Sequence, residues 1–402
     1  MTLAIHGGTP LRQTAYPQWP HYGPEEEQAL LRSLRQGHWW RMQGSENLAF
    51  EQSFSQMHGG HSAFAVANGT VALEIALQAA GVVPGDEVIV PAFTFISTSM
   101  ACQRIGATAM PVDVCADTLC IDPAAIEANI TPRTRAIIPV HMSGHMSDMA
   151  SLSRIADQHR LVLIQDAAHA HGAQGLGGAR IGDYGTLACF SFQNFKLMTA
   201  GEGGLVLCPN EALREKVFLY GNCGRPLGDR SYQHTVVGTN ARLGEFNAAV
   251  LSVQLERLPA QNELRQHNAR LLMDALNHDA LVTPQGRTAD AHVHPYYMVL
   301  FTLPEDGDLG QLDRNQVVDA LVAEGIPAFR AYQAIYRIPS FWQAPAPAHH
   351  DQAHFIAHCP VTERVASRGI WIHHRALLGS EQDTLDIALA VRKVVQHLAG
   401  SR

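Results

Sequence analysis

Short apolar segments alternate with longer segments of helical periodicity through the first half of the chain, and this alternation limits the possible folds. Segment 71–80, for example, places its apolar residues on one face of a helix. Such alternation predicts an α/β architecture, a parallel sheet with helices on both faces. The apolar segments with the length of buried strands are 63–66, 87–90, 107–112, 135–140, 161–166, 187–192 and 205–207.

The pattern changes near residue 260. A long helix, a strand over 296–303, a helix over 313–325, a strand over 326–329 and a final helix over 381–398 are expected there. This order predicts a smaller α+β domain at residues 261–402. Residues 1–260 are then a proline- and aromatic-rich arm and a large domain. A chain of 402 residues, 46% of them hydrophobic, is long enough for two such domains.

Segment 161–166 is the clearest buried strand, and it ends on a carboxylate, Asp166. Ligands of open α/β sheets gather at the carboxyl ends of the strands, so Asp166 is a candidate site residue. His169 and His171 follow it closely. A local Asx turn would explain Asp166 without any ligand, and core packing would explain both histidines.

A single lysine, Lys196, lies between the apolar segments 187–192 and 205–207, on a loop rich in glycine. Glycines allow a backbone or a ligand to approach closely. Burial makes an amine easier to deprotonate, and a neutral amine forms a Schiff base with an aldehyde. The alternative is an ordinary lysine whose stem crosses an apolar surface while its head reaches water.

The pair Gly69-Thr70 precedes the helix predicted over 71–80. The start of a helix offers free backbone N–H groups and the positive end of the helix dipole, both of which suit a phosphate. Asn68 and Thr70 would also cap a helix that binds nothing, so this feature alone leaves both readings open.

Composition excludes several classes of function. The net charge of −8 is spread along the chain without a basic tract, so we expect no nucleic-acid partner. No apolar run has the length of a membrane span, and the start lacks the features of a signal peptide, so we expect no membrane partner. The seven cysteines are scattered, which suits a cytoplasmic protein, and the 22 histidines form no metal-binding motif. We therefore expect no metal.

Three motifs together resemble those of the DegT/StrS-type aminotransferases, which are pyridoxal phosphate (PLP) enzymes of fold type I. The first is Ser191-Phe-Gln-Asn-Phe-Lys196 with the glycines that follow it, the second begins at Asp166 and the third is Asn68-Gly-Thr70. The resemblance covers essentially the whole chain. It implies a mostly parallel, seven-stranded sheet between helices in the large domain, with a smaller α+β domain after it.

The resemblance also implies roles for single residues. Lys196, Asp166 and His169 are expected to be catalytic: Lys196 forms the Schiff base, Asp166 pairs with the pyridine nitrogen and His169 contacts the ring's 3-oxygen. The remaining cofactor contacts are Gly69, Thr70 and Ser191 at the phosphate, Phe95 stacked on the ring, and Asn240 reaching the phosphate of the neighbouring subunit. Core packing is the alternative for Phe95 and helix capping for Asn240. A homodimer with shared active sites follows from the role of Asn240.

Within the family, several segments resemble 3-amino-5-hydroxybenzoate synthases in particular. They include Gly37-His-Trp-Trp-Arg-Met42, Cys223-Gly-Arg-Pro226 and Trp371-Ile-His-His-Arg375, and Leu197 replaces the asparagine usual after the lysine in sugar aminotransferases. Phe195 departs from the pattern, because glycine is expected there. We expect a small carboxylated ring as substrate, with Arg41, Arg225 or Arg375 on its carboxylate and Trp39 or Trp40 along one face. Core packing and a surface salt bridge are the alternative for the two tryptophans and Arg41.

Three functions remain open at this point. The first is dehydration and aromatisation of aminodehydroshikimate, with or without additional transaminase activity. The second is transfer of an amino group from glutamine or glutamate to a keto-sugar or keto-cyclitol. The third is a non-catalytic PLP-binding regulator, which the intact set of Lys196, Asp166, Ser191 and Thr70 disfavours. The same catalytic residues serve the first two reactions, so only the substrate pocket separates them.

Overall fold

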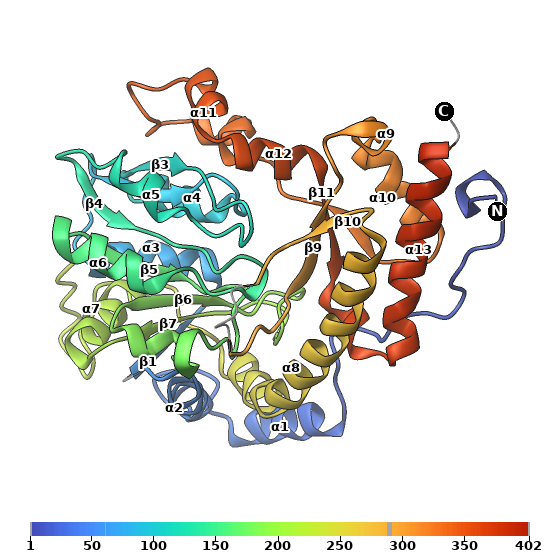
Figure 1. Cartoon of the computed structure of the whole chain (residues 1–402). Helices are drawn as coiled ribbons and strands as arrows, with labels where there is room; N and C mark the ends of the chain where they lie inside the picture. The colour runs from blue at the N-terminus through green and yellow to red at the C-terminus, as the bar shows by residue number, and fades with distance from the viewer. Residues whose placement is uncertain (1, 61, 288–291, 401–402) are drawn as a thin grey trace.

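A computed structural model describes residues 2–60, 62–287 and 292–400 (Figure 1). Its largest element is a seven-stranded sheet in which β7 runs antiparallel to both neighbours and the other pairs are parallel. The strands, in their order across the sheet, are β1 (Ser62–Val66), β7 (Gly204–Cys208), β6 (Leu187–Ser191), β5 (Val162–Asp166), β4 (Thr134–Ile137), β2 (Glu87–Pro91) and β3 (Thr108–Val112).

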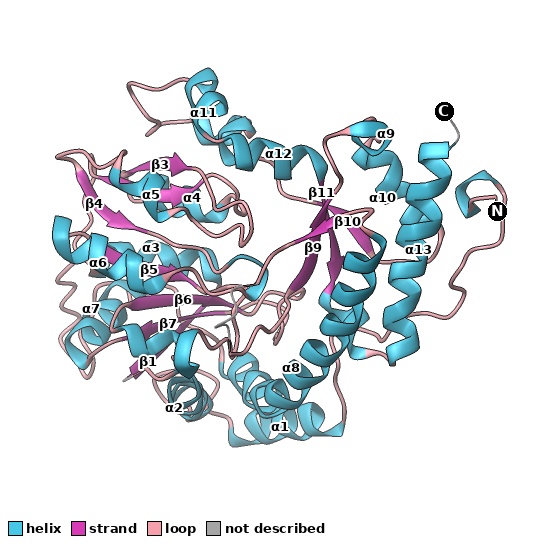
Figure 2. Ribbon diagram, in the orientation of Figure 1, coloured by secondary structure: helices cyan, strands magenta, loops and turns pink. Residues whose placement is uncertain are grey.

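Helices cover both faces of this sheet, as Figure 2 shows. Nearly every strand residue is buried, because a mostly parallel sheet is covered on both sides. One face packs against α2 (Glu46–His58), α5 (Pro123–Glu127), α6 (Met149–His159) and the first half of α8 (Glu245–Asp279). The other face packs against α3 (Gly69–Ala79), α4 (Ser97–Arg104), α7 (Glu211–Gly221) and α11 (Gln352–His358).

A second, antiparallel sheet of four strands forms the smaller domain. Its order is β10 (Ala328–Arg330), β11 (Gly369–His373), β9 (Met298–Thr302) and β8 (Thr283–Pro284). It shares a third core with α10 (Arg314–Ala323), α13 (Glu381–Gly400) and the second half of α8. The other helices are α1 (Pro24–Gln36), α9 (Gly307–Gly310) and α12 (Pro360–Arg368).

The N-terminal arm packs on the small domain, although it begins the chain. Leu3 and Tyr16 belong to the core of the small domain, and the backbone N–H groups of Ala4 and Leu11 donate to the Glu324 carboxylate. The start of the chain therefore lies beside the end of α13, where the described chain ends, and the His6 and His397 ring centroids are 6.1 Å apart (Figure 1). The helix α8 runs without interruption through residue 260, where we placed the domain boundary, and connects the two domains.

The observed architecture confirms the predicted fold class, a mostly parallel seven-stranded sheet between helices with a smaller α+β domain. Several predicted strands, among them 135–140 and 296–303, extend beyond the strands observed. We expected residues 135–140, whereas β4 ends at Ile137. The chain then reaches Pro139, which has no N–H to donate to a neighbouring strand, and only Val140 forms a further bridge, to Asp166.

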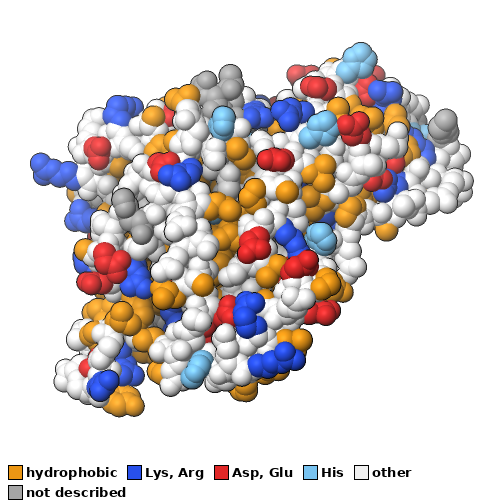
Figure 3. Space-filling model, turned by 90° about the horizontal axis from the view of Figure 1, so that it is seen from below, with side chains coloured by type: hydrophobic (Ala, Val, Ile, Leu, Met, Phe, Trp, Pro, Cys, Tyr) orange, Lys and Arg blue, Asp and Glu red, His pale blue; other side chains and the backbone are white. Residues whose placement is uncertain are grey.

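The surface bears charges of both signs. On the face of the molecule that carries α1 and α2, acidic and basic side chains lie interspersed (Figure 3). Among the described residues, no helix is long and apolar enough to cross a membrane.

Candidate active site

Asp166 lies at the carboxyl end of β5 and is 7% exposed. Its Oδ2 accepts a hydrogen bond from Thr98 Oγ1 at 2.9 Å, and its Oδ1 accepts one from the Ala168 N–H at 3.2 Å. Burial raises the pKa of Asp166 above its usual value, while these two hydrogen bonds and the nearby Lys196 favour the charged form. A cation placed against this carboxylate would therefore be strongly stabilising.

His169 and Lys196 meet on a tyrosine that the sequence did not indicate. The His169 ring stacks on Tyr297 with centroids 4.1 Å apart and an interplanar angle of 17°. The Lys196 Nζ lies 4.4 Å from the centroid of the same ring. Burial, with Lys196 as the next cause, lowers the pKa of His169 well below its usual value, so the imidazole is neutral. The structure thus brings the three predicted catalytic residues together.

Gly69, Thr70 and Ser191 gather at the start of α3. Asn68 Oδ1 caps the Val71 N–H at 2.9 Å, and the N–H groups of Gly69 and Thr70, at the first helical positions, have no acceptor within the helix. A Cβ atom on Gly69 would lie 2.7 Å from the Ser191 Cβ, so glycine allows the helix to approach β6 closely. Two hydroxyl side chains and a helix start therefore share one small region.

Phe95 is not a core residue. Its side chain is 54% exposed, and its ring centroid lies 6.0 Å from that of Tyr332. Tyr332 in turn lies 6.4 Å from the His169 ring. Burial raises the pKa of Tyr332 well above its usual value, so its hydroxyl stays neutral.

Arg41 has its partners within the chain. Its Nη2 lies 2.6 Å from Glu51 Oε1, and its Nη1 donates to Asn47 Oδ1 at 3.0 Å and to the Ala65 carbonyl at 3.2 Å. The guanidinium also covers the Phe64 ring at 4.1 Å. Arg41 therefore forms a salt bridge, as the alternative interpretation of this residue expected, but the pair is buried rather than on the surface. These contacts disfavour Arg41 as a ligand of a substrate carboxylate.

Arg225 and Arg375 differ in whether their guanidinium groups have partners within the chain. Arg225 forms an ion pair with Asp229, with 3.5 Å between Nε and Oδ2, and its Nη2 donates to the Asp229 carbonyl at 2.9 Å. Its guanidinium lies 4.4 Å from the centre of the Tyr232 ring. Arg375 is the second residue after β11, and its guanidinium forms no ion pair or hydrogen bond with the part of the chain that the structure describes.

Trp39, Trp40 and Asn240 lie on the surface of the single chain. The two tryptophans are 53% and 48% exposed, and Trp39 Nε1 donates to the Leu34 carbonyl at 3.2 Å. Core packing therefore does not account for the tryptophans. Asn240 is exposed and pairs through its backbone with Asn222, and it does not cap α8, which begins at Glu245.

Sequence reasoning missed Thr98, Tyr297 and Tyr332. Each reaches the site from a different part of the chain, and no local motif marks Tyr297 or Tyr332. Thr98 alone had a local signal: it lies at the start of a helix that follows a buried strand, four residues after Thr94. The hydroxyls of Thr94 and Thr98 are 3.2 Å apart.

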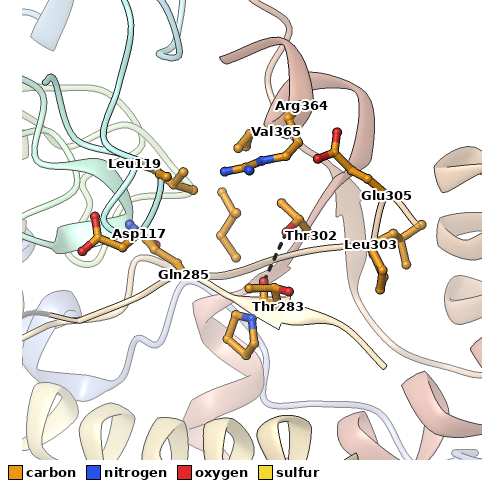
Figure 4. Close-up of a pocket in the computed structure, with 13 residues that line it drawn as sticks. Asp117, Leu119, Thr283, Gln285, Thr302, Leu303, Glu305, Arg364 and Val365 are labelled. Atoms are coloured by element: carbon orange, nitrogen blue, oxygen red, sulfur yellow. Dashed lines mark hydrogen bonds between the residues drawn. The ribbon is translucent and has the colours of Figure 1, made fainter. Parts of the chain in front are cut away.

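A separate cavity of about 160 Å³ lies between the two domains, close to β8 and β9 (Figure 4). Arg364, Asp117 and Gln285 contribute polar groups to its wall, and Thr302 Oγ1 donates to the Thr283 carbonyl at 3.4 Å. None of the residues predicted for the active site lines it.

Comparison with known proteins decides the family. Residues 22–391 match the model of the DegT/DnrJ/EryC1/StrS aminotransferase family. The chain belongs to this family. A 3-amino-5-hydroxybenzoate synthase of Amycolatopsis mediterranei (strain S699) is 48% identical over 370 residues, which cover 92% of this chain and 94% of that protein.

Two further relatives are informative about the kind of enzyme. An L-glutamine:2-deoxy-scyllo-inosose aminotransferase of Streptomyces kanamyceticus is 38% identical over 423 residues, covering 99% of this chain and 97% of that protein. The crystal structure of a 3-amino-5-hydroxybenzoic acid synthase superposes with a TM-score of 0.91 at 47% identity, covering 95% of this chain and 99% of the other. The chain is thus an enzyme of the aminotransferase family that resembles 3-amino-5-hydroxybenzoate synthase and acts on a small molecule.

Proposed function

We propose that the chain is a PLP enzyme that dehydrates and aromatises aminodehydroshikimate, with Lys196 as the amine that holds the cofactor's aldehyde. The observation that carries the proposal is the 48% identity to a 3-amino-5-hydroxybenzoate synthase along 94% of its length, with the predicted catalytic residues gathered in one place. The proposal rests on three further considerations: the fit of the cofactor, the movement of protons and the substrate.

The residues present fit PLP. The N–H groups of Gly69 and Thr70, with the Thr70 and Ser191 hydroxyls, would hold the phosphate at the start of α3. Asp166 is a buried carboxylate that forms no ion pair with the described residues, and it suits a protonated ring nitrogen. His169 Nδ1 is buried without a hydrogen-bond partner in the same part of the chain and would meet a ring oxygen. Phe95 would cover one face of the ring.

When bound, PLP supplies an electron sink that stabilises negative charge on a carbon of the substrate. The protons are then moved by Lys196 Nζ. Burial keeps His169 and Tyr332 neutral, which makes the imidazole a weak base and the phenol a weak acid at neutral pH. The Tyr297 ring face holds the ammonium form of Lys196 near the reacting atoms. Lys196 would take a proton from the substrate carbon and give one to the departing hydroxyl, which leaves as water.

The substrate contacts belong to Arg375 and Arg225 in this proposal. A guanidinium binds a carboxylate through two parallel hydrogen bonds, and the Arg375 side chain has no such partner within the described chain. The half-exposed Trp39 and Trp40 would form one wall of the pocket, in a homodimer whose second subunit supplies Asn240. Phe195 is also half-exposed, and its ring lies 5.5 Å from His373.

The alternative is an aminotransferase that uses glutamine, supported by the 38% identity to an L-glutamine:2-deoxy-scyllo-inosose aminotransferase along nearly the whole chain. One experiment separates the two. Purified protein is incubated with aminodehydroshikimate, and 3-amino-5-hydroxybenzoate is measured by its absorbance. In parallel, it is incubated with 2-deoxy-scyllo-inosose and glutamine, and the aminated product is measured. Product in the second reaction alone would replace the synthase proposal by the aminotransferase.

The same preparation tests the cofactor. The wild-type protein should be yellow, and borohydride reduction should fix the cofactor on the peptide that contains Lys196. The Lys196→Ala variant should yield no such peptide. Cofactor fixed on another peptide would overturn the assignment of Lys196.

A further inference from the structure

The loop that carries Lys196 satisfies part of its backbone locally. The Lys196 N–H donates to the Gln193 carbonyl at 2.8 Å, and Thr199 Oγ1 donates to the Phe192 carbonyl at 2.9 Å. The Phe195 N–H donates to the side chain of Gln193 at 2.9 Å. These bonds use the carbonyls of residues 192 and 193, so the carbonyls nearest to Lys196 need other donors.

Three side chains from distant parts of the sequence supply those donors. Trp19 Nε1 donates to the Asn194 carbonyl at 2.9 Å. His374 Nε2 donates to the Phe195 carbonyl, immediately before Lys196, at 3.0 Å. Arg265 Nη2 donates to the Leu197 carbonyl, immediately after Lys196, at 3.5 Å. The backbone on both sides of the lysine is therefore held from outside the loop.

The three donors also contact one another. The Trp19 and His374 rings meet edge to face with centroids 4.6 Å apart, and the Arg265 guanidinium lies 5.7 Å from the Trp19 ring. We call Trp19, Arg265 and His374 the carbonyl clamp. Trp19 comes from the N-terminal arm, Arg265 from α8 and His374 from the segment after β11, so the clamp joins the lysine loop to the small domain.

The protonation state of His374 follows from its partner. A carbonyl oxygen only accepts hydrogen bonds, so the proton of the neutral ring lies on Nε2. Burial lowers the pKa of His374 well below its usual value, and the neighbouring His373 and Arg265 act in the same direction. A single, neutral tautomer is thus available to bind the loop.

Arg265 is fully buried, and its hydrogen bonds go to uncharged oxygens. Its Nη1 donates to Asn262 Oδ1 at 2.9 Å and its Nη2 to Gln261 Oε1 at 3.2 Å, besides the Leu197 carbonyl. No ion pair satisfies it within the described chain, and burial lowers its pKa to about 9. A buried guanidinium without a carboxylate is costly. Its cost is offset only by such dipoles, which include the backbone beside Lys196.

We infer that the carbonyl clamp consists of positioning residues for Lys196: by fixing the backbone on both sides of the lysine, they fix where its Nζ lies. The inference rests on the proposed role of Lys196 in binding PLP and moving protons. A proton-transferring group must lie within hydrogen-bond reach of the reacting carbon, and a displacement of about 1 Å can cost on the order of a hundredfold in rate. Loosening the clamp should therefore lower kcat rather than weaken substrate binding.

The test compares two tryptophan variants that lose the same group. Trp19→Phe removes the indole N–H but keeps an aromatic ring. Trp342→Phe is the matched control, because Trp342 Nε1 also donates to a backbone carbonyl, that of Tyr336, at 2.8 Å. Trp19→Phe should lower kcat about tenfold with little change in KM, and it should shift the pH at which the visible absorption of the bound cofactor changes. Trp342→Phe should match the wild type in both measurements.

His374 allows a rescue experiment. His374→Phe removes the donor to the Phe195 carbonyl, whereas His374→Gln places an amide N–H near the position of Nε2. His374→Phe should lower kcat about tenfold, and His374→Gln should recover most of the loss. Amide hydrogen exchange of residues 193–197 in the holoenzyme should become faster in Trp19→Phe and His374→Phe, and thermal melting shows whether each variant is folded.

Different results would overturn the proposed function and the role of the carbonyl clamp. If the wild type binds no cofactor through Lys196, the proposed function fails before any variant is made. If the wild type is yellow and active while folded Trp19→Phe and His374→Phe match it in absorption and kcat, and loop exchange is unchanged, the carbonyl clamp does not position Lys196. Equal loss in Trp19→Phe and Trp342→Phe would likewise overturn the inference.

Discussion

Asp166 shows how a residue can be unfavourable in the empty fold and useful with a ligand. Its carboxylate is buried at the end of β5, where Thr98 and the Ala168 N–H are its hydrogen-bond donors. Burial raises its pKa above the usual value. A carboxyl group with a raised pKa contributes stability below its unfolded pKa, and this contribution is lost as the pH rises through the folded pKa.

We therefore predict that Asp166→Asn stabilises the cofactor-free protein at neutral pH. The amide has no charge to desolvate, so the variant should melt at a higher temperature than the wild type at neutral pH and lose this advantage in acid. Thermal melting of both proteins across this pH range is the measurement. Addition of PLP should stabilise the wild type more than the variant. An unchanged difference at all pH values would mean that Asp166 is not the titrating group.

Two arginines offer a second contrast at the residue scale. Arg41 is held by Glu51, Asn47 and the Ala65 carbonyl, whereas the Arg375 guanidinium has no ion pair within the described chain. Arg375→Lys should lower kcat/KM for the carboxylated substrate about a hundredfold, because lysine cannot make the two parallel hydrogen bonds. Arg41→Lys should instead lower the free energy of unfolding by ~1–3 kcal/mol with little effect on kcat/KM. Steady-state kinetics and urea unfolding of both variants measure these effects, and a reversal between them would exchange the two roles.

Among the elements, the start of α3 has the tightest steric requirement of the site. Gly69 has no room for a side chain, since a Cβ atom there would lie 2.7 Å from the Ser191 Cβ. Overpacking of this kind costs about 1–3 kcal/mol. Gly69→Ala should therefore raise the dissociation constant of PLP roughly tenfold to a hundredfold by pushing α3 away from β6.

The matched control lies at the start of another helix. Gly244, the N-cap of α8, would place a Cβ atom 3.2 Å from Asn247 Oδ1, a longer contact than the one at Gly69 and one made with the end of a side chain. Gly244→Ala should bind PLP as the wild type does. Fluorescence titration of the cofactor-free proteins with PLP gives both constants. Equal affinities in Gly69→Ala and the wild type would mean that the phosphate does not bind at α3.

Elements were predictable where their signals are local. Buried strands and amphipathic helices repeat with fixed periods, so the sheet and the start of α3 could be predicted from the sequence, and the motifs around Asp166 and Lys196 resembled those of a known family. The donors to the lysine loop could not. Trp19 and Asn194 are 175 positions apart, and Phe195 and His374 are 179 apart. Such contacts are set by the packing of one domain on another, which no spacing in the sequence records.

At the scale of the whole molecule, the two domains meet at the loop that carries Lys196. The N-terminal arm and the segment after β11 both pack in the core of the small domain, and both reach the lysine loop of the large domain. The small domain therefore contributes directly to the geometry of the site. Phe95, which lies near Tyr332 in the site, is about half exposed, and Trp39, Trp40 and Asn240 lie on the surface of the single chain.

The exposed position of Asn240 leads to a prediction on assembly. If Asn240 serves the site of the neighbouring subunit, Lys196→Ala and Asn240→Ala are each inactive as homodimers, because every site then lacks one residue. A hybrid dimer contains one site with both residues and one site with neither. Random pairing makes half of the dimers hybrids with one working site of two, so mixing the variants should restore roughly a quarter of the wild-type activity.

The measurement is activity after subunit exchange of the two variants in equal amounts, with exchange itself followed by a size-tagged subunit. Mixing each variant with itself is the control and should restore nothing. Each variant should retain the melting temperature of the wild type, which shows that the loss is local to the site. Absence of recovery despite complete exchange would place Asn240 in the site of its own subunit. The exposed side of the site would then be an entrance for substrate rather than a surface that the second subunit completes.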